Sequence, residues 1–204
     1  MKKVLTISLL LLTIITISSC KNKEKKENTP IKKGYTVEAK TTTINWIAYK
    51  TTNKVPVKGQ FTEVTIENSK KSSTVQEALN GLKFDISVNS IFTKDTIRDA
   101  KLKKFFFGTM KDTNSISGII SMNNETSGTV ELTMNGISKV LPVTYVISDN
   151  MVTIEAVMNL DNWQAQLAIE TLNTACKDLH SGDDGISKTW SEVKIEVTTS
   201  LKYE

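Results

Sequence analysis

The stretch NSIFTKDTIRDAKLKKFFFGTM, from Asn89 to Met110, joins the densest aromatic cluster of the chain to a dense cluster of charges. Three consecutive phenylalanines, Phe105 to Phe107, follow directly behind seven charged side chains that lie between Lys94 and Lys104. A segment of this kind buries its rings while its lysines keep their ammonium groups in water. What the rings cover depends on the compartment and the architecture of the rest of the chain.

The first residues predict export and lipidation. Lys2 and Lys3 precede an uncharged run from Val4 to Ile17, which is shorter than the about 20 apolar residues that a membrane-spanning helix needs. The run ends in ISSC, which resembles a bacterial lipobox and implies cleavage before Cys20 and acylation of that residue. We therefore expect a lipoprotein signal peptide at 1–19, with several acyl chains on Cys20 (palmitate among them) holding the protein durably at a membrane.

A charged tether is expected at 20–34, because KNKEKKENTPIKKGY has no apolar periodicity. The formal charge of the whole chain is +4, and removing Lys2 and Lys3 leaves +2. The segment from Lys21 to Lys33 carries six lysines and two glutamates, a charge of +4, so the rest of the chain is near −2. The basic character belongs to the leader and the tether, and we expect no nucleic-acid partner.

From Tyr35 onward the chain alternates apolar and polar residues with a period of two, which is typical of half-buried strands. About eight such runs with short connections predict an all-β domain at 35–204, an eight-stranded antiparallel lipocalin-like barrel with one or two short helices. A two-sheet sandwich is the structural alternative. The alternation slips by one residue between Gln60 and Glu63, which predicts a bulge or bend. Asn135-Gly136 between two runs predicts a tight hairpin.

Three segments depart from the alternation. Val75 to Leu82 is expected to form one or two helical turns, and Thr93 to Phe106 is expected to be helical or rich in turns. The segment from Asp161 to Cys176 is the best helix candidate, with Asp161 as its cap. Its apolar stripe consists of Ala165, Ala168, Leu172, Ala175 and Leu179.

The stretch SIFTKDTIRDAKLKKFFF resembles the signature of the YceI-like family, in which Ser-Ile-x-Thr is followed by Arg-Asp-x-x-Leu and a Phe pair. Two further blocks agree in order, VKGQFTEVTI at Val57 to Ile66 and LTMNGISKVLPV at Leu132 to Val143. The resemblance implies an exported lipocalin-like barrel that holds a polyisoprenoid chain, such as that of a quinone or a prenyl phosphate, in its lumen. The segment from Asp161 to Trp190 departs from shorter family members, which puts the shape of the pocket in doubt.

On this resemblance, Leu102, Phe105 and Phe106 are expected to turn inward over the lumen as a lid, while Lys101, Lys103 and Lys104 stay in water. An equally weighted alternative is that the rings plug the end of the barrel. Arg98 and Asp99 would pair with each other or cap nearby backbone groups, and Arg98 is also a candidate for contacting a ligand headgroup. The expected ligand-binding residues are Phe84, Ile86, Val88, Arg98, Leu102, Phe105 and Phe106.

A metal site and an enzyme are both disfavoured. His180 is the only histidine and stands four residues after Cys176, too few ligands for a closed zinc site of the usual composition. We expect a buried thiol at a helix end, with no metal and no cofactor other than a bound polyisoprenoid or quinone. The chain has no nucleophile-elbow motif and no phosphate-binding glycine-rich loop, so we expect no catalytic residues.

The sequence therefore predicts an envelope lipoprotein whose barrel binds an apolar or amphiphilic molecule, and the resemblance implies that this molecule is an isoprenoid lipid. The alternative is a filled barrel that serves as a structural, interaction or stress-related envelope protein without a small ligand. Lys21 stands where enteric bacteria place an inner-membrane retention Asp, which favours the outer membrane facing the periplasm and leaves surface exposure open. Whether two barrels pair as a homodimer is left open as well.

Overall fold

The structure, a computed structural model, describes residues 32–204. The leader, Cys20 and most of the tether lie outside the described residues. The described part is mainly β. Its strands are β1 (Tyr35–Thr36), β2 (Thr42–Lys50), β3 (Val55–Phe61), β4 (Val64–Ile66), β5 (Lys83–Ser87), β6 (Ile91–Phe92), β7 (Ser115–Met122), β8 (Ser127–Met134), β9 (Ile137–Ser148), β10 (Met151–Asn159), β11 (Thr189–Ser200) and β12 (Lys202–Tyr203).

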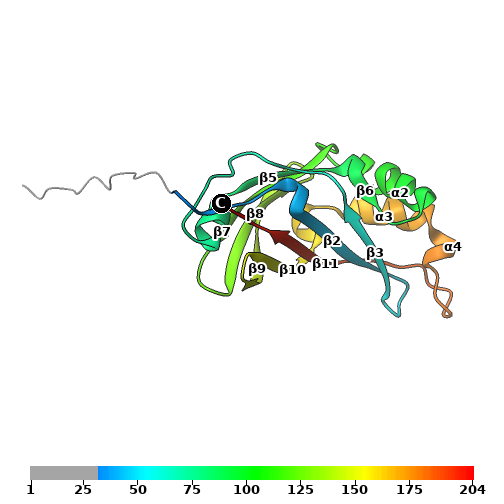
Figure 1. The fold of residues 1–204 in the computed structure, drawn as a ribbon. Coiled ribbons are helices and arrows are strands. Elements are labelled where there is room, and N and C mark those ends of the chain that lie inside the picture. Colours follow the sequence, from blue (N-terminus) through cyan, green and yellow to red (C-terminus); the bar gives the residue numbers. More distant parts are fainter. Residues whose placement is uncertain (1–31) are drawn as a thin grey trace, which may run out of the picture. The chain divides into compact units, whose positions relative to one another are not determined.

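The helical segments are short and gather mostly at one end of the described domain (Figure 1). Four are α-helices, where we expected one or two: α1 (Val75–Leu79), α2 (Thr96–Lys101), α3 (Gln166–Ala175) and α4 (Lys177–His180). A π-helical turn, η3 (Leu102–Phe106), continues α2. The 3₁₀ turns are η1 (Ala39–Thr41), η2 (Val88–Ser90), η4 (Phe107–Thr109) and η5 (Leu160–Trp163).

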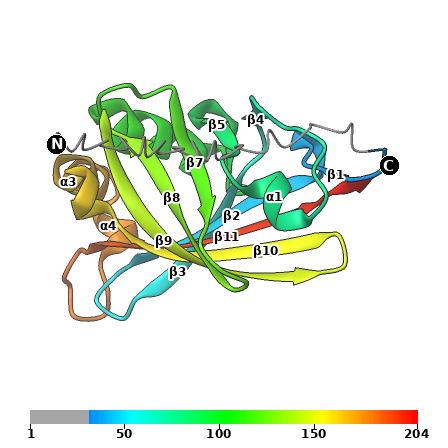
Figure 2. The ribbon, with the colours of Figure 1, turned by 90° about the vertical axis from the view of Figure 1, so that its left-hand side faces the viewer.

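Ten strands form one curled antiparallel sheet in the order β4-β5-β7-β8-β9-β10-β11-β2-β3-β6. A second, two-stranded sheet pairs β1 with β12. The curl of the large sheet makes a half-barrel, with α2 and α3 at one end and β1 and the C-terminus at the other (Figure 2). This sheet therefore has ten strands where we expected about eight.

The count differs because two of the expected strands are each interrupted. β3 and β4 are separated only by Thr62 and Glu63, the place where the apolar alternation slips, so the expected bend is confirmed. The 3₁₀ turn η2 interrupts β5 and β6 in the same way. β3 pairs with β2 and β6, and β4 pairs with β5. The sequence pattern locates the bend, but it does not tell whether the hydrogen bonds between neighbouring strands continue across the bend.

The hairpin predicted at Asn135-Gly136 is confirmed. Met134 of β8 lies opposite Ile137 of β9, and both loop residues have positive φ, 55° for Asn135 and 68° for Gly136. Two positive φ values are the geometry of a type I′ turn, which matches the twist of the flanking strands. The Asn135 amide also donates to the backbone carbonyl of Trp163 at 2.8 Å, so this hairpin holds η5 in place.

The C-terminal helix begins later than expected. The chain first forms η5, whose start is capped by Asn159, since Asn159 Oδ1 accepts from the Asp161 N–H at 3.0 Å. Gln164 then takes a left-handed conformation, and α3 begins only at Gln166. The expected cap at Asp161 is wrong because the break at Gln164 separates that residue from α3.

Candidate ligand cavity

The curled sheet encloses an apolar cavity with a volume of about 140 Å³. The side chains around it come from the concave face of the large sheet, from α1 and the residue Leu82 that follows it, and from Val37 between β1 and η1. They are Val37, Thr42, Ile44, Phe61, Val64, Ile66, Leu79, Leu82, Phe84, Ile86, Ile116, Ile120, Val130, Leu132, Met134, Leu141, Val143, Ile154, Ala156, Met158, Ile195, Val197 and Thr199. The period-two alternation of the strands produces this lining, because it turns one apolar face inward.

Only two of the lining residues carry a polar side chain, and these two satisfy each other. The hydroxyls of Thr42 and Thr199 lie 2.8 Å apart, within hydrogen-bond distance. No residue of the lining carries a titratable side chain. A guest in this cavity would therefore be held by apolar burial and packing, without a polar anchor.

The cavity is small compared with a lipid tail. A dry apolar cavity of about 150 Å³ in another protein accepts benzene, whereas pockets for larger ligands run from about 300 to 1,000 Å³. Met134 and Met158 are part of the lining, and unbranched methionine side chains rearrange readily. A chain longer than a benzene-sized group requires such rearrangement.

Two of the expected ligand-binding residues, Phe84 and Ile86, line the cavity. Phe84 lies across Gly118 on the neighbouring strand β7, where an added Cβ would stand 2.7 Å from the ring. The absence of a side chain at Gly118 therefore makes room for the ring. Val88 is buried in η2 but is not part of the cavity lining.

The expected lid residues lie at the helical end, which we define as the end of the sheet covered by α2, η3, η4, η5 and α3 (Figure 2). Leu102 and Phe105 are partly buried against the core, and Phe106 is buried. None of the three lines the cavity. Phe107, which we did not single out, is also buried and meets Phe106 edge-to-face with ring centroids 4.9 Å apart.

Trp163 of η5 is also buried at this end. Its side chain is only 1% exposed, and its indole Nε1 donates to the backbone carbonyl of Leu132 at 3.0 Å. Three residues that follow in the sequence, Ala165, Ala168 and Leu172, are buried, as the expected apolar stripe of the helix predicts. Leu179, which also belongs to that stripe, is exposed. Phe106, Phe107 and Trp163 are thus all buried at the helical end, and we call these three residues the plug below.

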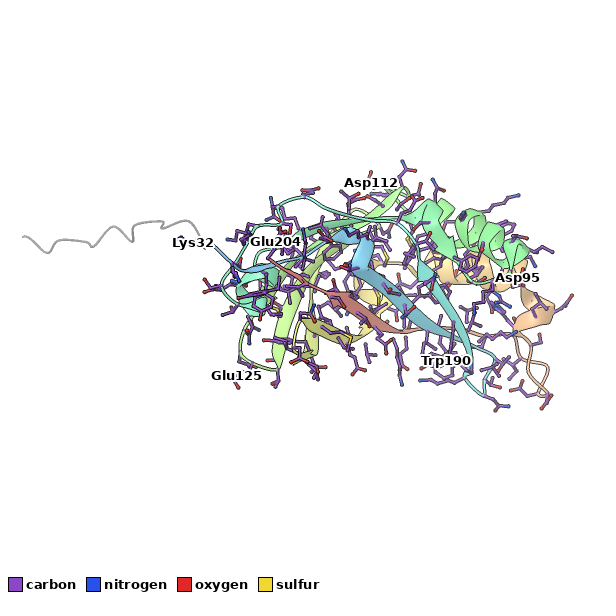
Figure 3. All side chains as sticks on the ribbon, in the orientation of Figure 1. Lys32, Asp95, Asp112, Glu125, Trp190 and Glu204 are labelled. Carbon is purple, nitrogen blue, oxygen red and sulfur yellow. The ribbon has the colours of Figure 1, made fainter. Side chains whose placement is uncertain are left out.

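Arg98 and Asp99 do not pair with each other. The Asp99 carboxylate accepts from the Thr93 N–H at 2.8 Å and from the Thr93 hydroxyl at 2.7 Å, so it fixes the entry into α2. Arg98 forms an exposed ion pair with Asp95, whose carboxylate also caps α2 and lies at the helical end (Figure 3). The Arg98 backbone N–H at this cap lowers the pKa of Asp95.

Arg98 lines a surface groove rather than the cavity. The groove has a volume of about 560 Å³ and runs over β3 beside β6. Four cationic side chains and no carboxylate line it; the cations are Lys50, Lys58, Lys94 and Arg98. Such a groove favours an anionic group through Coulomb attraction, weakened by solvent at this exposed surface.

Cys176 and His180 lie where α3 passes into α4. Cys176 is a buried free thiol, and His180 Nδ1 lies 2.7 Å from the Thr189 hydroxyl. Burial, together with Lys50 and Lys101, lowers the pKa of His180 to about 4. Within residues 32–204, no three His, Cys, Asp or Glu side chains come close enough together to hold a metal ion.

Most of the cavity lining was not among the expected ligand-binding residues. Val130, Leu132 and Met134 of β8 and Ile116 and Ile120 of β7 line the cavity. These residues belong to the runs of apolar and polar alternation that predict strands. Applied to every strand instead of β5 alone, the same signal would have found the lining.

Comparison of this chain with known proteins identifies one matching family and several solved structures with a similar fold. The profile of the YceI-like domain family matches residues 35–201. A polyisoprenoid-binding domain from Saccharophagus degradans, implicated in plant cell wall breakdown, has 15% sequence identity and a TM-score of 0.59 over 84% of this chain and 98% of its own. BcnA of Burkholderia cenocepacia has 16% identity and a TM-score of 0.55 over 81% of this chain and 98% of its own. Comparison with curated proteins finds no match.

Identities this low support a shared fold and nothing more specific. None of the helices within 32–204 has the length and apolar character needed to cross a membrane.

Proposed function

This chain belongs to the YceI-like domain family, and on that premise we propose that it binds an apolar or amphiphilic molecule, an isoprenoid lipid, in the lumen of its curled sheet. The family is one of binding proteins that are typically non-enzymatic. The observation that carries the proposal is the cavity, whose lining is apolar apart from one mutually bonded threonine pair.

We also propose that the sheet closes into a barrel of eight strands around this lumen. In this barrel β3 and β4 would count as one bent strand, and β5 and β6 as another. The support is a set of contacts across the bend: Thr62 N–H donates to Ser90 O at 3.1 Å, and Ser87 N–H donates to Glu63 O at 3.2 Å. These bonds continue the ladder between the β4–β5 and β3–β6 pairings.

Apolar burial supplies enough free energy for such a ligand. A forty-carbon chain that buries about 400 Å² of apolar surface at about 25 cal/mol per Å² gains on the order of 10 kcal/mol before the costs of ordering it. Because the empty cavity is small, the cost of moving side chains offsets part of this gain in free energy. The affinity then depends on how readily Met134 and Met158 rearrange.

A second candidate function follows from the same small volume. A cavity of about 140 Å³ is also what a nearly filled barrel leaves behind, and a structural or interaction protein of the envelope needs no ligand. The plug at the helical end agrees with this alternative.

Anchoring belongs to the proposal as well. We propose that cleavage before Cys20 and its acylation tether the domain to a membrane, with the outer membrane facing the periplasm favoured, so that the cavity stays close to a source of lipid. The support is the sequence of the first 20 residues. A mature mass that includes acyl chains on Cys20 is the expected result, and an unmodified N-terminus would contradict it.

The binding proposal is tested by extracting the purified full chain with organic solvent and measuring bound lipid by mass spectrometry. We expect an isoprenoid lipid in stoichiometric amount. The matched variants are Val130→Phe, which fills the cavity, and Ile119→Phe, which adds the same ring to the neighbouring strand β7 at a partly exposed residue outside the lining. Val130→Phe should lose the lipid and Ile119→Phe should keep it. An empty wild-type chain would favour the filled-barrel alternative.

A further inference from the structure

The pairing between β9 and β10 covers only part of both strands. β9 pairs with β8 from Met134↔Ile137 to Ser127↔Thr144. It pairs with β10 only from Met151↔Ser148 to Glu155↔Thr144. Beyond that point β10 continues to Asn159, paired with β11 but not with β9. The large sheet therefore has a split, between residues 137–143 of β9 and residues 156–159 of β10.

Pro142 gives a physical reason for the split. The Tyr145 N–H donates to Thr126 O at 2.8 Å, on the side of β9 that faces β8. Backbone groups alternate between the two neighbours along a strand, so the backbone of Pro142, three residues earlier, faces β10. Proline has no N–H and cannot donate to a ladder, which confines it to edges and bulges. β9 therefore offers β10 no donor at the place where their pairing ends.

A surface groove with a volume of about 960 Å³ lies over the split. Both strands line it, with Pro142, Val143 and Thr144 on β9 and Glu155, Ala156 and Val157 on β10. Three groove residues, Val143, Ala156 and Ile195, also line the inner cavity. A single layer of residues thus separates the groove from the cavity, at a place where no backbone ladder holds β9 and β10 together.

The helical end offers no comparable passage. The plug residues Phe106, Phe107 and Trp163 are buried there, and Trp163 is hydrogen-bonded to β8. Moving buried aromatic side chains disrupts many dispersion contacts at once. Separating two strands that are already unpaired breaks no backbone hydrogen bond between them.

We propose that the split between β9 and β10 is the lateral entrance through which an isoprenoid chain passes from the outer groove into the cavity. This inference rests on the proposed function, since it names the route to the same lumen. Val157 marks the entrance on the outer surface: it is apolar, 59% exposed and part of the groove lining. The groove is lined by both charged and apolar side chains, the charged ones being Lys58, Glu155, Lys194 and Glu196, and at the split itself Pro142 and Val157 are apolar. An entering chain therefore meets these two side chains before it reaches Ala156 and Val143.

The test compares rates of binding with affinities, using geranylgeraniol as the probe and the full chain. Pro142→Val restores a backbone donor and should let β9 and β10 pair beyond Thr144. We expect association and dissociation each to slow by about tenfold, with the equilibrium affinity unchanged within about twofold, because a gate alters the barrier and not the end states. Pro56→Val on β3, away from the split, is the matched control and should leave both rates unchanged.

A second pair of variants keeps the test decisive if Pro142→Val fails to fold. Val157→Trp places a bulky ring in the groove, and Val146→Trp places the same ring at a site of similar exposure, 68% exposed, where β9 and β10 are paired. The first should slow association and the second should not. Hydrogen exchange of the β10 amides should slow in Pro142→Val and stay unchanged in Pro56→Val.

Each contrary outcome has a distinct meaning. Unchanged rates in Pro142→Val and Val157→Trp, with slowing in Ile97→Trp at the helical end, would overturn the lateral entrance and leave lumen binding intact. A loss of affinity in Pro142→Val without a change in association rate would also overturn it, because that residue would then act on the bound state. A wild-type chain that does not bind the probe would overturn the entrance together with the proposed function.

Discussion

The plug at the helical end and the middle of the lumen are both built from apolar side chains, yet they are packed differently. At the helical end Trp163 is fully covered and Phe106 meets Phe107 edge-to-face. In the lumen, the inward faces of the same strands leave a cavity of about 140 Å³. Hydrophobic composition alone therefore does not separate a stabilising core from a binding site. Packing separates them, and substitutions should act differently in the two regions.

The largest effect is expected from removing the plug. Trp163→Ala should lower the free energy of unfolding by about 3–5 kcal/mol, through lost apolar burial and the cavity left behind. Chemical denaturation measures this change. Trp163→Phe is the control: it keeps most of the ring volume but loses the bond to Leu132 O, and should cost clearly less. Equal losses in the two variants would mean that the hydrogen bond, and not the packing, holds this end together.

The same substitution placed in both regions sharpens the comparison. Ala168→Leu adds three carbons to the packed helical end and should destabilise the domain by about 1–3 kcal/mol. Ala156→Leu adds the same atoms beside the lumen and should change the free energy of unfolding by less than about 1 kcal/mol, because the cavity accepts them. Thermal and urea unfolding of the two variants measure the difference. A cost at Ala156 as large as that at Ala168 would show that the lumen is already full.

A pH effect is expected at His180 of α4, next to the helical end, but not in the lumen, where no titratable side chain lies. The pKa of His180 is lowered to about 4, below its ordinary value near 6.5, so the unfolded chain takes up the proton first. The stabilising contribution of neutral His180 is complete above about pH 6.5 and is lost as the pH falls toward 4. Because the ring is half-exposed and solvent screens it, we expect about 1 kcal/mol.

The control for this effect is His180→Asn, which cannot titrate. The difference in unfolding free energy between wild type and variant should shrink between pH 6.5 and 4. A difference that stays constant over this range would contradict the lowered pKa.

The smallest effect on stability is expected at Arg98, because its ion pair with Asp95 is exposed. Arg98→Gln should change the free energy of unfolding by less than about 0.5 kcal/mol. If Arg98 contacts a ligand headgroup, the variant should bind geranylgeranyl phosphate several-fold more weakly while binding geranylgeraniol as before. Lys111→Gln, which lies outside the cationic groove, serves as the control. Equal affinities of wild type and Arg98→Gln for geranylgeranyl phosphate would show that Arg98 does not contact the headgroup.

The sequence predicts the local features of this fold, its turns and bends, well. Asn135-Gly136 requires a hairpin whatever surrounds it, and the slip between Gln60 and Glu63 marks a bend because one face must stay apolar. The clean alternation of their strand also places Phe84 and Ile86 on its inward face, and both line the cavity. The three blocks that resemble the YceI-like family fixed the family and the expected fold class.

Features that depend on contacts distant in sequence were not predictable in the same way. Nothing local tells that Phe107 is buried as deeply as Phe106, or that Arg98 turns to Asp95 instead of Asp99. Trp163 stands outside the apolar stripe of the expected helix, and its burial follows from the break at Gln164. The cavity volume is set by how all the strands curl together, so no single run of residues encodes it.

The most direct test of lumen binding uses the methionine methyl groups as reporters. In a chain with ¹³C-labelled methionine methyls, geranylgeraniol should give intermolecular nuclear Overhauser effects to Met134 and Met158, which line the cavity. It should leave Met151, an exposed residue at the far end of β10, unaffected. Contacts and shift changes confined to Met134 and Met158 are the result that lumen binding predicts. A saturating ligand that leaves both methyls unchanged would contradict it.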